Sequence, residues 1–91
     1  MNVRHLSFRL LQVYQAVVQT GSISQAARQL HLTQPTVSIQ LKKLTDWAGE
    51  PLLESQHGTL VPSRVGAELY RASQDVLGRF ADFSQFVQSA R

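Results

Sequence analysis

The chain has 91 residues, a net charge of +3, 43% apolar residues and 16% charged residues, and no cysteine. This composition fits one small folded domain, argues against disorder, and excludes disulfides and thiolate metal sites. No apolar run approaches the roughly 18 residues of a membrane span, and residues 1–10 lack the apolar stretch of a signal peptide. We therefore expect a cytoplasmic protein with no membrane contact, whose mild basic charge permits a polyanionic partner without requiring one.

Two helices are predicted in the first third of the chain. Apolar residues at helical spacing between Leu6 and Gln19 predict the first helix, which Gly21 ends. Ser22 and Gln25 have the spacing of a capping box and predict the start of a second, short helix. Its apolar face, with two adjacent alanines that favour a close helix crossing, comprises Ile23, Ala26, Ala27 and Leu30.

A third helix follows after a very short turn. Thr33 is a plausible N-cap, Pro35 falls in the first turn where it costs little, and Gly49 ends the helix. The predicted buried stripe is Val37, Leu41, Leu44 and Ala48. Two short helices joined by a tight turn form the helix-turn-helix pattern, which is moderately specific because any short helical hairpin has the same form. The turn has His31 where glycine is frequent, and histidine tolerates left-handed backbone.

The outward face of this third helix has an uncharged beginning and a basic rear. At about 100° per residue, that face carries Pro35, Thr36, Ile39, Lys42, Lys43 and Asp46, flanked by Gln34, Ser38 and Gln40. Glutamine can address adenine, and lysines can reach phosphates. The pattern suits a recognition helix over 34–45 that enters the major groove by its N-terminal end. An ordinary amphipathic helix with a polar outer face has the same pattern.

The rest of the chain predicts a small β-hairpin and a long helix. Two short apolar pieces flank a turn near His57 and Gly58, and Ser63 caps a helix that runs nearly to Arg91. A seven-residue apolar seam with steps of 4, 3, 4, 4, 3 and 4 follows this helix: Val65, Leu69, Ala72, Val76, Phe80, Phe83 and Val87. The seam predicts pairing with a second copy, and the alternative is that the helix folds back on its own domain.

The order of these features resembles the N-terminal region of LysR-type transcriptional regulators. The resemblance covers nearly the whole chain and is carried by MNVRHL, GSISQAARQLHLTQPTVSIQLKKL, GEPLLE and PSRVG. The block AARQLHLTQPTVS is highly specific to that family. It implies a mainly α, winged helix-turn-helix with a small β-hairpin wing over 1–62, and a long C-terminal linker helix for dimerisation over 63–91. It also implies a DNA-binding fragment whose effector-binding domain is absent.

The resemblance further implies a role for individual positions. The residues expected to face bases are Gln34, Pro35, Thr36, Ser38 and Ile39. Those expected at phosphates are Ser22, Ser24, Thr33, Lys42, Lys43, Ser63 and Arg64, and the wing at the minor groove is His57, Gly58 and Thr59. The implied partners are double-stranded DNA and a second copy of the chain. A tetramer is possible for the full-length regulator, and a small-molecule effector would bind only the missing domain.

The chain departs from the family pattern at three positions. Ser55 stands where the family usually has arginine, so the wing is poor in positive charge and Arg64 is the nearest cation. Thr45 replaces a usual glutamate, and Ile39 replaces a frequent arginine. An aliphatic residue at position 39, followed by QLKKL, is similar to the branch that regulates carbon-fixation genes.

Other classes of function are weighed against this one. No nucleophile–base pair, carboxylate pair or glycine-rich phosphate loop is visible in the sequence, so we expect no catalysis and no cofactor. The three histidines are widely spaced without partner ligands, so we expect no metal site. The alternative from a different class is a helix-pairing interaction module whose helix-turn-helix is purely structural. Salt-dependent binding to duplex DNA separates the two.

Overall fold

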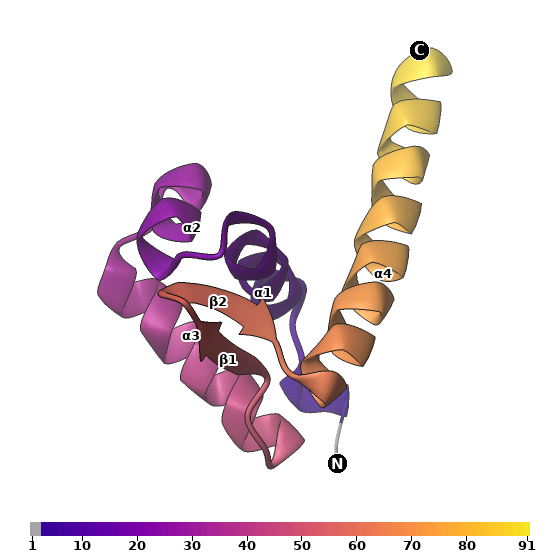
Figure 1. The fold of residues 1–91 in the computed structure, drawn as a ribbon. Helices are drawn as coiled ribbons and strands as arrows, with labels where there is room; N and C mark the ends of the chain where they lie inside the picture. Colours follow the sequence, from indigo (N-terminus) through magenta and orange to yellow (C-terminus); the bar gives the residue numbers. More distant parts are fainter. Residues whose placement is uncertain (1–2) are drawn as a thin grey trace.

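The structure is a computed structural model that describes residues 3–91 (Figure 1). A short 3₁₀ turn at Val3–His5 precedes the helices α1 (Phe8–Thr20), α2 (Ile23–Leu30) and α3 (Gln34–Ala48). The antiparallel strands β1 (Leu53–Gln56) and β2 (Thr59–Pro62) follow, and α4 (Arg64–Ser89) ends the chain. The expected fold class, a mainly α winged helix-turn-helix with a long C-terminal helix, is confirmed.

Local capping signals set the helix boundaries. Each of the four α-helices begins after a hydroxyl residue whose oxygen accepts a backbone N–H of the first turn. Because Ser7 is the cap of α1, that helix begins at Phe8, two residues later than Leu6. The capping box at α2 is half formed: Ser22 Oγ accepts from the N–H of Gln25 (3.2 Å), but Ser22 N–H donates to Thr20 Oγ1 (3.3 Å).

The apolar core is small and has two connected parts. One lies between α1, α2 and α3, where Ala26 and Ala27 are buried as the adjacent alanines predicted. The other lies where α1, α3 and the start of α4 meet around Tyr14 and Leu44. Leu53 of β1 packs against both parts, which attaches the base of the hairpin to the helices. The three-helix unit therefore holds α3 by one face and leaves its opposite face in solvent.

Tyr14 ties α1 to the segment that leads into the hairpin. Its side chain is fully buried, and its hydroxyl donates to the Leu52 carbonyl at 2.7 Å. The same carbonyl accepts the N–H of Ser63 at 3.2 Å. Gly66 of α4 passes so close that an added Cβ would overlap both the Leu52 carbonyl and the Tyr14 hydroxyl. Burial raises the pKa of Tyr14 to about 12, because the phenolate would lose its hydration there.

The hairpin turns near His57 and Gly58, as its sequence predicted. Gln56 lies opposite Thr59, which leaves His57 and Gly58 as the turn. Both have positive φ, 53° and 79°, the conformation of a type I′ turn, which matches the right-handed twist of the strands. Histidine is uncommon in this conformation, and His31, the C-cap of α2, has it too, with φ of 57°.

The last helix has two different halves. Its first half packs against α1 through Gly66, Leu69, Tyr70 and the fully buried Ser73, whose hydroxyl donates to the Leu69 carbonyl at 2.8 Å. Its second half projects beyond the rest of the domain (Figure 1). Within residues 3–91, no helix is long and apolar enough to cross a membrane.

Candidate nucleic-acid interface

The exposed face of α3 carries most of the residues expected to face bases. Gln34, Pro35, Ser38 and Ile39 are exposed at the beginning of the helix, and Ile39 keeps 56% of its surface. Thr36 is half-buried. Val37 and Leu44, on the opposite side, are fully buried. The packing of α3 therefore turns an uncharged surface with one aliphatic side chain toward solvent.

The start of α3 is stabilised by two threonine hydroxyls. Thr33 Oγ1 accepts the N–H of Thr36 at 3.2 Å, and the two hydroxyl oxygens lie 2.9 Å apart. This pair fixes the first turn that presents Gln34. A helix N-terminus has unpaired N–H groups and a partial positive charge, so it suits an anion. Ser22 has the equivalent place at the start of α2.

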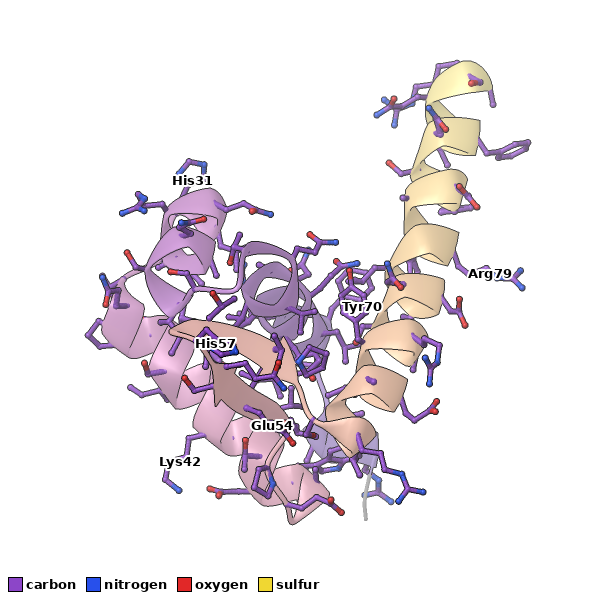
Figure 2. The ribbon with its side chains drawn as sticks, in the orientation of Figure 1. His31, Lys42, Glu54, His57, Tyr70 and Arg79 are labelled. Carbon is purple, nitrogen blue, oxygen red and sulfur yellow. The ribbon has the colours of Figure 1, made fainter. Side chains whose placement is uncertain are left out.

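The basic rear of α3 is partly neutralised. Lys42 Nζ lies 3.0 Å from Asp46 Oδ2 and 3.3 Å from Oδ1, one helical turn away, and both side chains are well exposed. Figure 2 shows Lys42 pointing away from the body of the domain. Lys43 is exposed and has no acidic partner within residues 3–91. The positive charge of Lys43 is therefore not offset by a nearby carboxylate, whereas that of Lys42 is partly offset by Asp46.

One of the expected phosphate contacts is almost fully buried. Ser63 is only 9% exposed, and its hydroxyl donates to the Pro51 carbonyl at 2.9 Å and accepts the N–H of Gly66 at 3.0 Å. Its hydrogen bonds are used inside the protein, so its side chain is a structural cap between the hairpin and α4. The next residue, Arg64, is exposed.

A cation on α2, Arg28, was not among the expected phosphate contacts. Arg28 is exposed, and its Nη1 donates to Ser24 Oγ at 3.3 Å. The two residues are four apart on one helix, which is the spacing that brings side chains together. Arg28 therefore adds positive charge beside Ser24, one of the expected phosphate contacts, and the spacing was the signal that could have found it.

The wing is exposed and weakly charged. His57, Gly58 and Thr59 all lie at the surface, and Figure 2 shows His57 at the hairpin with Glu54 on β1. Ser55 lies opposite Leu60 on β1. Because it stands where the family usually has arginine, β1 carries no cation. Glu54 adds a negative charge instead. Exposed cations therefore lie on α2 and α3, at Arg28, Lys42 and Lys43, and not on the wing.

The apolar seam of α4 is divided by the packing of that helix. Leu69 is half-buried against the domain, and Phe80 contacts Phe8 of α1 edge-to-face with ring centroids 5.2 Å apart. Phe83 still has 62% of its surface exposed. The helix therefore folds back on its own domain through Leu69 and Phe80, as the alternative expected, and leaves apolar surface exposed at Phe83. Pairing with a second copy stays a prediction.

Comparison with known proteins agrees with this arrangement. Residues 8–67 match the family model "Bacterial regulatory helix-turn-helix protein, lysR family". The chain is 34% identical over 85 residues to a RuBisCO operon transcriptional regulator of Acidithiobacillus ferrooxidans, covering 93% of this chain and 28% of that protein. It is 35% identical over 89 residues to the HTH-type transcriptional regulator CfxR of Cupriavidus necator, covering 98% of this chain and 28% of that protein.

Two solved structures of DNA complexes have the same fold. The DNA-binding domain of CbnR bound to DNA has a TM-score of 0.76 at 30% identity, over 94% of this chain and all of that one. The DNA-binding domain of BenM bound to the catB site 1 DNA has a TM-score of 0.84 at 25% identity, over 92% of this chain and 93% of that one. The chain therefore belongs to the LysR family of bacterial regulatory helix-turn-helix proteins, and it spans 28% of the length of the two curated relatives.

Proposed function

We propose that this chain binds double-stranded DNA sequence-specifically, as the DNA-binding part of a LysR-type transcriptional regulator in the cytoplasm. The observation that carries the proposal is the exposed face of α3, uncharged at its beginning and basic at its rear. A helix entering the major groove reads base edges with its first residues and meets the backbone further along. In this arrangement Gln34, Pro35, Thr36, Ser38 and Ile39 face base edges.

The phosphate contacts surround this reading surface. Ser22 and Thr33 stand at the N-termini of α2 and α3, where backbone N–H groups favour an anion. Arg28 with Ser24, and Lys43 with Lys42, supply positive charge on the two helices. The wing residues 57–59 approach the neighbouring minor groove with little charge of their own.

The surface that the α4 seam leaves exposed fits a second copy of the chain in antiparallel orientation. The steps of the seam read the same in both directions, so two antiparallel helices centred on Val76 bring all seven positions together. Ala72 then lies opposite Phe80, and Leu69 opposite Phe83. A small residue facing a large one fills the interface, whereas a parallel pair would place Phe80 against Phe80.

The charges beside the seam favour the same orientation. Asp75 and Arg79 are exposed on one flank, and Figure 2 shows Arg79 pointing away from the rest of the domain. In an antiparallel pair centred on Val76, Asp75 of one copy lies near Arg79 of the other. A parallel pair would set this flank against the opposite flank of the partner and would not bring Asp75 near Arg79. The resulting two-fold dimer would present two recognition helices to two half-sites.

The identity of the whole regulator follows from its relatives only as a proposal. One curated relative described above is a RuBisCO operon transcriptional regulator, and the other is CfxR. Ile39 with the following QLKKL is also similar to the branch that regulates carbon-fixation genes. We infer a regulator of that branch, whose remaining length would hold the effector-binding domain and any contacts that make a tetramer.

The test begins with selection of bound sequences from random duplex DNA. The selected site is then titrated together with duplexes that change one base pair at a time. Gln34→Ala should lose discrimination at one base pair, on the order of 1–3 kcal/mol, and should leave the other positions unaffected. Gln85→Ala, an exposed glutamine on α4, is the matched control. A chain that dimerises but shows no salt-dependent DNA binding would be an interaction module instead.

A further inference from the structure

The junction between α1 and α2 is bonded to the wing. The carbonyl of Gly21 accepts the N–H of Leu60 at 2.9 Å. Leu60 lies opposite Ser55, at a position of the hairpin where the N–H points away from β1 and needs a partner elsewhere. Figure 1 shows the beginning of β2 close to the segment that joins α1 and α2. The bond therefore attaches the tip end of the wing, not its base, to the helix-turn-helix.

The same junction leaves no room for a side chain at position 21. Gly21 has a φ of +72°, and a Cβ placed on it would lie 2.6 Å from Thr59 Cγ2. Both the left-handed backbone and the close approach of Thr59 require glycine. Thr20 holds this junction from the other side, because its hydroxyl donates to the Ala16 carbonyl at 2.8 Å and accepts the N–H of Ser22.

From this geometry we propose that Gly21 is a positioning residue for DNA binding, which holds the wing tip at a fixed place relative to α2 and α3. The inference rests on the proposed function. Neither β1 nor the turn at His57 and Gly58 carries a lysine or an arginine, so phosphates do little to draw the wing into place. Such a weakly attracted wing contributes most to DNA affinity when it is already held in its bound position. Binding then does not have to offset the entropy lost in ordering the wing.

The test uses rescue by removal of one methyl group. Gly21→Ala should displace Thr59 and lower affinity for the selected duplex about tenfold, by undoing the preorganisation of the wing. Thr59→Ser removes Cγ2 and keeps the hydroxyl, whereas Thr59→Val keeps Cγ2 and replaces the hydroxyl with a second methyl group. Combined with Gly21→Ala, Thr59→Ser should restore affinity to within about threefold of the Thr59→Ser single variant, and Thr59→Val should not.

Footprinting separates a positioning role from general damage. In Gly21→Ala, hydroxyl-radical protection beside the minor groove should disappear, while protection of guanine N7 in the major groove should remain. Loss of both protections in a variant that is still folded by circular dichroism would overturn the proposal. So would equal rescue by Thr59→Ser and Thr59→Val.

A further measurement needs neither DNA nor a variant. The amide of Leu60 should exchange its hydrogen slowly in the free chain, at a rate similar to that of the paired amides of the hairpin, because Gly21 already holds it. Fast exchange at Leu60 would overturn the proposal even if Gly21→Ala fails to fold. Failure of the unchanged chain to bind any duplex would instead refute the proposed function.

Discussion

Replacing Asp46 with asparagine should tighten binding to every duplex, selected or not, by about threefold at low salt. The carboxylate lies 3.0 Å from Lys42 Nζ, so a phosphate that contacts Lys42 comes within roughly 7 Å of it. Two like charges at about 7 Å repel by about 0.6 kcal/mol in bulk water, which is close to a factor of three. The stability lost with the ion pair is smaller, about 0.3–0.5 kcal/mol, because both groups are exposed.

Fluorescence anisotropy titrations at several salt concentrations measure this effect. Asp82→Asn makes the same change of net charge on the exposed face of α4 and should change affinity much less. Lys42→Ala should weaken binding to all duplexes alike and lower the salt slope by about one unit. Equal gains from Asp46→Asn and Asp82→Asn would show that only net charge matters. That result would refute the placement of Lys42 at a phosphate.

Three other predictions concern the fold and the dimer. Gly66→Ala should lower the free energy of unfolding by about 3 kcal/mol or more, from overpacking at a buried site. Gly78→Ala, with open space around it, should instead raise this free energy by about 0.5–1 kcal/mol. Urea titration compares the two variants, and equal effects would contradict the packing described. The pKa of Tyr14, raised to about 12 by burial, means that the folded state holds a proton which the unfolded state loses above about pH 10. Stability should therefore fall by on the order of 2 kcal/mol between about pH 10 and 12, and this part of the fall should be absent in Tyr14→Phe. Phe83→Glu should convert a dimer to a monomer in sedimentation equilibrium, while Phe86→Glu, beside the seam, should not; a monomeric unchanged chain at high micromolar concentration would remove the basis for the dimer.

The elements of this fold could be predicted because their signals are local. Ser22 and Thr33 cap helices by bonding residues three positions on, Gly49 ends α3 in a left-handed conformation, and His57 with Gly58 forms a turn from adjacent residues. Most of the outward face of α3 followed from helical geometry, since Val37 is buried as assumed, although Thr36, expected on that face, is half-buried.

The features that the sequence did not predict depend on contacts between distant segments. Ser63 has the local pattern of a cap, but its second bond to Pro51, which removes it from the surface, exists only in the folded chain. The bond from Leu60 to Gly21 joins residues far apart in sequence. The apolar pattern of α4 is the same in both halves, so only the packing against α1 shows which seam residues stay exposed.

The most direct test of the central claim, that α3 lies in the major groove, uses the methyl group of thymine. That methyl is an apolar feature of the major groove. Ile39 is exposed on α3 and cannot hydrogen-bond to a base edge, so an apolar contact with this methyl is the base contact open to it. Thymines of the selected site are replaced by uracil one at a time, against both the unchanged chain and Ile39→Ala. At one position the replacement should weaken binding of the unchanged chain by roughly 1 kcal/mol, the scale of one buried methyl, and should have almost no effect on Ile39→Ala. Absence of coupling at every thymine would contradict the contact and, with it, this placement of the helix.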